Sequence, residues 1–144
     1  MEINGLPLHP LVVHAAVIFG PIAALTAIVY WIYPRFGDRL RWPMLVLALL
    51  AVASIVTAYL TGNDFLDSRP ELATSPQVQT HEDRAWQLLW TTLVFGGFAV
   101  AAAALHRKKG PLRVGVGIGL GLSAVTVLVL VFLTGEAGAR AVWG

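Results

Sequence analysis

Four long apolar stretches follow one another along the chain, at residues 10–33, 43–62, 84–105 and 112–134. A helix needs about 20 apolar residues to cross a hydrocarbon core of about 30 Å, and each stretch is long enough. The segments between them carry nearly all of the charged residues and several prolines. The pattern therefore predicts four transmembrane helices joined by polar loops.

The third helix is predicted to begin before its apolar stretch. Ser75 is followed by Pro76, and a serine cap followed by proline at the first helical position is typical of a helix N-terminus. The third helix is therefore expected at 76–105, with its first turns in water. At steps of three and four, its residues form a narrow, mostly small stripe, the expected inward face of a membrane helix. The stripe consists of His81, Ala85, Leu88, Thr92, Gly96 and Ala99.

The composition also indicates a membrane protein. Hydrophobic residues make up 57% of the 144 residues and charged residues only 12%, against roughly a quarter charged in a soluble domain. No basic residue precedes Arg35, so the first stretch is not expected to be a secretory signal peptide. The absence of cysteine excludes disulfides, thiolate iron–sulfur ligation and covalent haem attachment. The net charge of +2 gives no reason to expect a nucleic-acid partner.

The basic residues are concentrated in two loops, those that follow the first and third stretches. Seven of the ten lie there: Arg35, Arg39, Arg41, Arg107, Lys108, Lys109 and Arg113. The positive-inside rule places these loops in the cytoplasm, and both termini and the middle loop outside it. The predicted fold class is all-α: an integral membrane antiparallel four-helix bundle, forming a single domain over residues 1–144.

Three of the four histidines fall at the outer ends of the predicted helices. Pro10 suits a first helical position, so His9 is predicted as the helix cap and His14 about one turn inside. His81 lies at a similar depth on the third helix. His106 follows the third helix on the opposite side, about 30 Å away by the helix rise, and is interpreted as an interfacial cation.

Three kinds of chemistry fit such a cluster. A b-type haem takes one imidazole from each of two helices, and His14 and His81 are the predicted axial pair. A copper or zinc ion would use His9, His14 and His81, with Glu136 or Asp83 as a further ligand. Without a cofactor, the histidines would help to dock a partner subunit. Five residues turn a helix by about 500°, which leaves the rings of His9 and His14 about 140° apart, so their spacing alone is weak evidence for a metal.

The sequence GVGIGLG at residues 115–121 alternates glycine with apolar residues but follows no strand, so a phosphate-binding loop is not expected. Its glycines fall into two GxxxG registers on opposite faces of the fourth helix, which favours close helix packing. No Ser–His–acid, paired-carboxylate or HExxH arrangement is visible in the sequence. A catalytic mechanism is therefore poorly supported, and the chain is not expected to be an enzyme by itself.

Three segments resemble a known family. They are GLPLHPLVVHAAV at the start, TGNDFLDSRPELATSPQVQTHEDRAWQ after the second stretch and TGEAGARAVWG at the end. They resemble the bacterial domain-of-unknown-function family 2231, four-helix membrane proteins, over essentially the whole chain. The family is similar in outline to two-haem b-type cytochromes, and some members look fused to Rieske iron–sulfur domains. The resemblance implies electron transfer in the bacterial cytoplasmic (inner) membrane.

Matched by position, the family's histidines correspond to His9, His14 and His81. Many relatives have histidine where this chain has Glu136, so the resemblance implies that a carboxylate takes over any ligand role there. We therefore expect a haem-binding electron-transfer subunit, quinone-linked or part of a respiratory complex, with a membrane redox partner or a second copy of the chain. The alternatives are a cofactor-free accessory or assembly subunit and a copper- or zinc-binding membrane protein.

Overall fold

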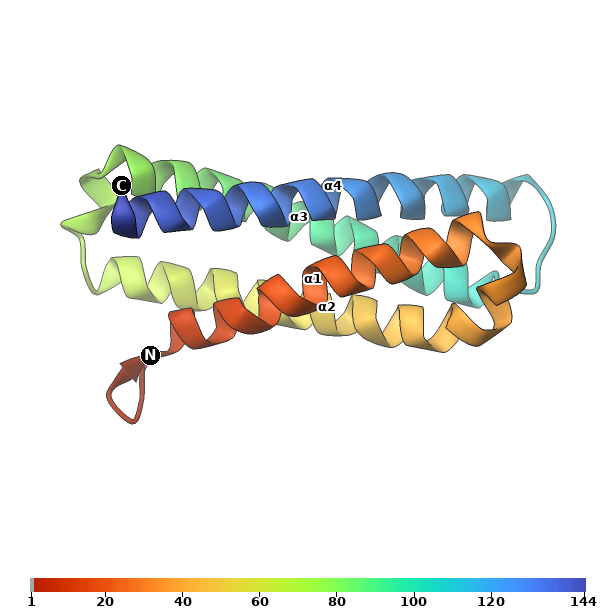
Figure 1. Ribbon diagram of the computed structural model, residues 1–144, viewed down its shortest axis with the longest axis horizontal. Coiled ribbons are helices and arrows are strands. Elements are labelled where there is room, and N and C mark those ends of the chain that lie inside the picture. The colour runs from red at the N-terminus through yellow and green to blue at the C-terminus, as the bar shows by residue number, and fades with distance from the viewer. Residues whose placement is uncertain (1) are drawn as a thin grey trace.

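The computed structural model describes residues 2–144 and consists almost entirely of helices (Figure 1). A two-stranded hairpin comes first and four long helices follow. The elements are β1 (Glu2–Ile3), β2 (Leu6–Pro7), α1 (Leu8–Ile32), the 3-10 turn Pro34–Phe36, α2 (Gly37–Asp67), the 3-10 turn Leu72–Thr74, α3 (Pro76–Ala104) and α4 (Pro111–Trp143). The hairpin was not predicted. Asn4 and Gly5 both have positive φ, as its two-residue turn requires.

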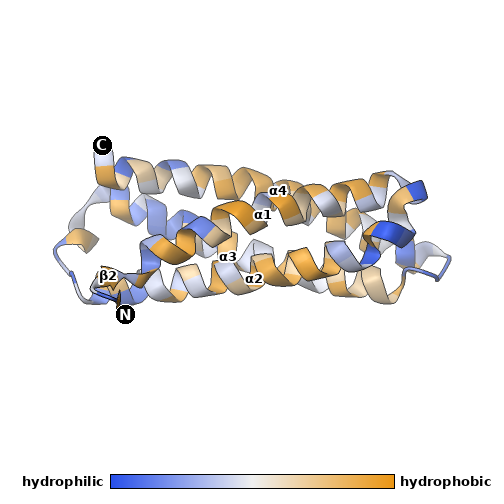
Figure 2. Cartoon of the chain, turned by 60° about the horizontal axis from the view of Figure 1, so that its bottom comes forward, coloured by the Kyte–Doolittle hydropathy of each residue, from blue (hydrophilic) through white to orange (hydrophobic). Residues whose placement is uncertain are grey.

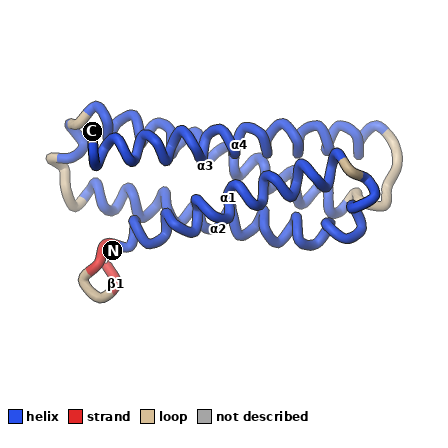
Figure 3. The backbone as a smooth tube through the Cα atoms, viewed as in Figure 1, coloured by secondary structure: helices blue, strands red, loops and turns tan. Residues whose placement is uncertain are grey.

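Each helix runs back along the one before it, and the four lie side by side (Figure 1). α1 packs on α2 and α4, and α3 packs on the same two helices, so α1 and α3 are diagonally opposite. The loops lie only at the two ends of the bundle (Figure 3). All four helices are long and apolar enough to cross a membrane, as the hydropathy pattern predicts.

Three helices extend beyond their predicted bounds. α1 begins at Leu8, before its predicted start at residue 10. α2 covers Gly37–Asp67 instead of 43–62, and α4 continues to Trp143 instead of ending at 134. The physical reason is that hydropathy marks only the part of a helix suited to lipid. The helical hydrogen bonds continue into the polar ends, because adding a residue to a helix that has already formed costs little free energy.

The start of α3 is at Pro76, directly after Ser75. The Ser75 side chain does not cap the helix, however. Its hydroxyl donates a 2.9 Å hydrogen bond to Oε1 of Gln77, and it makes no bond to the amides of the first turn. The predicted inward stripe of α3 is observed in its membrane part, where Leu88, Thr92, Gly96 and Ala99 are buried. This stripe sets the side of α3 on which His81 lies.

The interior of the bundle is built mainly from alanine. Eleven alanines are among the buried residues, whereas only a few large side chains, such as Phe95 and Met44, are fully buried. Many Leu, Ile, Val and Trp side chains are exposed on the outside. Figure 2 shows the hydrophobic colour along the middle of the helices and hydrophilic residues at both ends. Small residues inside and large apolar residues outside are what a bundle surrounded by lipid requires.

The alternating glycines of α4 receive aromatic rings from the neighbouring helices. Gly117 and Gly121 face Trp31 of α1, where an added Cβ would lie 2.4 Å and 2.7 Å from the indole. Gly119 faces Phe98 of α3, where the same distance is 2.4 Å. The predicted close packing at these glycines is therefore present, but the contact is between an aromatic ring of one helix and the backbone of α4. Two backbones do not meet there.

Candidate functional site

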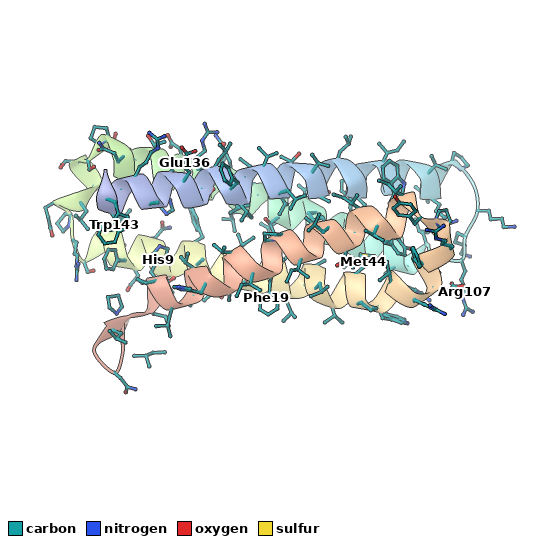
Figure 4. All side chains as sticks on the ribbon, in the orientation of Figure 1. His9, Phe19, Met44, Arg107, Glu136 and Trp143 are labelled. Atoms are coloured by element: carbon teal, nitrogen blue, oxygen red, sulfur yellow. The ribbon has the colours of Figure 1, made fainter. Side chains whose placement is uncertain are left out.

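His9 and His81 come together at one end of the bundle. His9 is in the first turn of α1 and His81 is in the second turn of α3. Their ring centres are 6.5 Å apart and their planes are inclined by 70°. Because α1 and α3 are diagonally opposite, the two rings approach each other across the bundle axis. Figure 4 shows His9 at the same end as Trp143, with Met44 and Arg107 toward the other end. We call these the His9 end and the His106 end.

Both rings are anchored in the same way on the adjacent helix. Nδ1 of His9 lies 2.9 Å from the carbonyl oxygen of Ala58, and Nδ1 of His81 lies 3.0 Å from that of Thr134. Since a carbonyl only accepts, each Nδ1 carries the proton and donates. Each acceptor precedes a glycine by four residues, Gly62 in α2 and Gly138 in α4.

The two glycines make these bonds possible. An added Cβ would lie 3.0 Å from Cε1 of His9 at Gly62, and 3.1 Å from Cε1 and Nδ1 of His81 at Gly138. The missing side chain therefore lets each ring lie directly against the helix backbone. We call each carbonyl and glycine together a glycine cradle. The spacings Ala58-x-x-x-Gly62 and Thr134-x-x-x-Gly138 are visible in the sequence and are the signal that was missed.

The anchoring leaves Nε2 of both rings unprotonated in the neutral form. Within residues 2–144, neither Nε2 has a hydrogen-bond partner. Histidines that bind metal usually donate their other ring N–H to a carbonyl or carboxylate, which fixes the tautomer and the ring orientation. The pair therefore has the arrangement of two ligands held ready by their neighbours.

A polar pocket of about 240 Å³ opens beside His9. Phe65 of α2 stacks on the His9 ring at 6.4 Å with a 27° tilt, and the guanidinium of Arg69 lies 4.6 Å from the centre of Phe65. The pocket is lined by Pro7, His9, Thr61, Asp64, Phe65, Ser68 and Arg69. His9 is thus reached from the polar end of the bundle, while Phe65 shields one face of its ring.

The predicted pair of His14 and His81 is not the pair that the structure brings together. His14 is exposed on the outside of α1, and its Nδ1 donates a 2.6 Å hydrogen bond to the carbonyl oxygen of Pro10. Since α1 is already helical from Leu8, no unwound start brings His9 and His14 to the same side. The turn that directs His9 inward directs His14 outward. Counting back from the buried Ala23 in helical steps of three, four and seven gives the buried Gly20, the buried Ala16 and then His9. This spacing indicates that His9 lies on the buried face of α1.

The copper or zinc set is not assembled either. Glu136 is half-exposed and forms an ion pair of 2.7 Å with Arg140, one turn further along α4. No group of three or more His, Cys, Asp and Glu side chains in residues 2–144 is placed to hold a metal ion. Of the ligands that the sequence suggested besides His9 and His81, His14 and Glu136 are thus bonded to groups of their own helices.

Residues 5–144 match the family described as "Predicted membrane protein (DUF2231)". The chain belongs to the DUF2231 family. The match covers all four helices of the bundle and includes His9, His14, His81 and Glu136. No curated protein and no solved structure matches the chain significantly.

The DUF2231 bundle also contains a second polar cluster, at the His106 end. His106, which the sequence suggested as an interfacial cation, is buried and only 8% exposed. Its Nδ1 lies 2.7 Å from the hydroxyl of Tyr30, and its Nε2 lies 2.6 Å from Oδ1 of Asp38. The ring rests against Gly37, where an added Cβ would lie 3.2 Å from Cε1. Sequence reasoning missed this cluster because its members come from α1, α2 and the α3–α4 loop.

Proposed function

We propose that this DUF2231 protein is an antiparallel four-helix bundle of the bacterial cytoplasmic membrane, with its His9 end outside the cytoplasm. The charge distribution supports this orientation. Seven of the ten Lys and Arg residues lie at the His106 end, in its two loops and in the first turns of α2 and α4. Basic loops of this kind remain in the cytoplasm. Both termini and the His9–His81 pair are then on the outer side of the membrane.

We further propose that His9 and His81 are the axial ligands of a b-type haem and that the protein is an electron-transfer subunit. The observation that carries this proposal is the 6.5 Å between the ring centres. Two imidazoles on opposite sides of one metal ion have ring centres roughly 6.5 Å apart, from about 2.1 Å for each metal–nitrogen bond and about 1.2 Å from nitrogen to ring centre. The axial pair is thus His9 with His81, in place of His14 with His81.

The donor set fits haem iron better than a bare copper or zinc ion. A porphyrin supplies the equatorial nitrogens, so two imidazoles complete the iron, whereas zinc and copper sites take three or four protein ligands. The glycine cradles fit as well, because they hold both rings by Nδ1 and leave Nε2 available. The pocket beside His9, about 240 Å³, is smaller than the roughly 300–1,000 Å³ of typical ligand sites. A macrocycle between His9 and His81 would therefore need more space than this pocket provides.

Haem iron, when bound, supplies one-electron transfer. The groups of the chain itself hold and orient it. Nε2 of His9 and of His81 would be the ligand atoms, and the carbonyls of Ala58 and Thr134 fix both rings through Nδ1–H. Phe65 stacks on one face of the His9 ring. A redox partner or a quinone would approach from this outer side.

The absorption spectrum of detergent-purified protein, expressed with ample haem supply, tests the proposal. We expect bound haem with two imidazole ligands. His9→Ala and His81→Ala should each lose haem or change its spin state, because each removes one of the two iron–nitrogen bonds. His14→Ala and His106→Ala are the matched controls and should keep the spectrum. His14 is exposed, and His106 lies at the opposite end.

Two outcomes would contradict different parts of the proposal. Equal spectra for His9→Ala and His14→Ala in a haem-containing preparation would refute the ligand assignment alone. Absence of haem from the unmutated protein would refute the cytochrome function. Metal analysis of the same sample would then separate a copper- or zinc-binding protein from a cofactor-free accessory or assembly subunit.

A further inference from the structure

The cluster at the His106 end is independent of the histidine pair. It is a chain of short hydrogen bonds that leads from water into the bundle. The Asp38 side chain is 95% exposed, whereas the side chain of His106 is 7% exposed and Tyr30 is 8% exposed. The links are Asp38 Oδ1 to His106 Nε2 at 2.6 Å and His106 Nδ1 to the Tyr30 hydroxyl at 2.7 Å. The carboxylate is thus exposed, whereas the imidazole and the phenol are largely buried.

When the His106 ring is neutral, its bonding partners fix the direction of each hydrogen bond. The Asp38 carboxylate only accepts, so Nε2 of His106 carries the proton and donates to it. Nδ1 of the neutral ring is therefore an acceptor, and the Tyr30 hydroxyl donates to it. The same hydroxyl lies 3.3 Å from the carbonyl oxygen of Ala102, a longer alternative. Tyr30 thus has a base at hydrogen-bond distance although it is largely buried.

A buried phenol with its own base is the arrangement that one-electron oxidation requires. Removing an electron from tyrosine without its proton would leave a positive charge on a largely buried ring, which is costly. A base at hydrogen-bond distance takes the proton as the electron leaves. Tyr33 is 46% exposed and lies next to the guanidinium of Arg35, with no imidazole contact among residues 2–144. Tyr33 therefore lacks the neighbouring base that Tyr30 has.

We propose that Tyr30 is a redox-active tyrosine whose oxidation transfers its proton to His106. The O–H bond of Tyr30 breaks, one electron passes to a one-electron oxidant, and the proton forms an N–H bond at Nδ1 of His106. The products are a neutral tyrosyl radical, an imidazolium and the oxidant reduced by one electron. Reduction of the radical returns the proton to the phenolic oxygen. The site would serve as an electron donor to a high-potential metal complex or radical at the cytoplasmic side.

Asp38 stabilises the product of this step. Its carboxylate already accepts from Nε2, so the positive charge formed on the imidazole is paired at 2.6 Å without rearrangement. The cations that act on Tyr30 are Arg41 of α2 and Arg113 of α4. They disfavour an added positive charge on the phenol, so the proton has to leave together with the electron. Arg41 itself is held by a 2.9 Å bond from Nε to the carbonyl of Ala103.

The network also joins α1, α2 and the α3–α4 loop, so a purely structural role is the competing explanation. A flash-quench experiment on the purified protein distinguishes the redox role from the structural role. Photogenerated tris(bipyridine)ruthenium(III) is the oxidant, and electron paramagnetic resonance detects the radical. Ring-deuterated tyrosine labelling distinguishes tyrosyl from tryptophanyl signals. We expect a long-lived tyrosyl radical that Tyr30→Phe abolishes and the matched control Tyr33→Phe retains.

The proton step has its own readouts. His106→Gln should slow formation of the radical by about 100-fold or more, the usual contribution of a positioned base. Transfer of the unmutated protein into deuterated water should also slow it. Asp38→Asn removes an exposed carboxylate and should slow formation less than His106→Gln, with melting unchanged. If His106→Gln does not fold, the solvent isotope effect and Asp38→Asn decide the matter.

A radical that persists in Tyr30→Phe would overturn the proposal, because another residue would then be the donor. Equal rates for folded His106→Gln and the unmutated protein, or the absence of a solvent isotope effect, would overturn the proton transfer to His106. In either case the network would be structural. None of these outcomes depends on whether haem binds at the His9 end.

Discussion

The glycine cradle of His81 gives a prediction that can be worked out from distances. In Gly138→Ala, the new methyl group would lie 3.1 Å from Nδ1 and Cε1 of His81, while ordinary contacts begin at 3.4 Å. The ring therefore has to move by a few tenths of an ångström, away from the carbonyl oxygen of Thr134 to which it is bonded at 3.0 Å. Weakening this half-buried bond costs about 0.5–1.5 kcal/mol.

Gly135→Ala is the matched control. Gly135 lies on the same helix, and an added Cβ there would meet nothing within 4 Å. Alanine is better than glycine in a helix interior by about 1 kcal/mol, and both variants gain this amount. We therefore expect Gly135→Ala to raise the free energy of unfolding by about 1 kcal/mol. Gly138→Ala should leave it close to the unmutated value, because the weakened bond offsets the gain.

The assay is unfolding of the detergent-solubilised protein by dodecyl sulfate, followed by circular dichroism. A second pair, Gly138→Val and Gly135→Val, enlarges the contrast, because the two further methyl groups would occupy the place of the His81 ring. The helix propensity of valine cancels within this pair. Nitrogen NMR of labelled histidine should show loss of the bonded Nδ1–H only in the Gly138 variants. Equal stabilities within both pairs would refute the role of the cradle.

Three further predictions concern other parts of the bundle. An impermeant thiol reagent applied to intact cells should label Ser75→Cys and not Lys108→Cys; the reverse would invert the proposed orientation. Gly117→Ala should lower the free energy of unfolding by about 1–3 kcal/mol through overpacking, because its Cβ would lie 2.4 Å from the Trp31 ring. The same change in a Trp31→Ala background should cost nothing, and an equal loss there would show that the ring is not the cause. Thr92 is 1% exposed and its hydroxyl has no partner within residues 2–144, so Thr92→Val should stabilise the protein by about 1 kcal/mol; a loss of stability would mean that the hydroxyl is satisfied.

The sequence by itself determined the class of protein and the number of helices. Apolar runs of sufficient length and the low content of charge leave a helix as the form in which a single segment satisfies its own backbone in lipid. The Ser75–Pro76 pair located the start of α3, and the small stripe through Thr92 and Gly96 located its inward face. These features are encoded within one helix at a time. The extensions into water were missed because hydropathy follows lipid contact and not helical hydrogen bonding.

The tertiary structure alone decided which histidines meet. The spacing of His9 and His14 fixes about 140° between their rings, but the rotation of α1 about its axis is set by its alanine face packing on α2 and α4. That rotation turns His9 toward His81 and His14 toward the outside. The cluster of Tyr30, Asp38 and His106 has the same cause, since its members are separated by 68 to 76 residues from His106. Contacts between distant segments depend on how whole helices pack, and no local pattern contains that information.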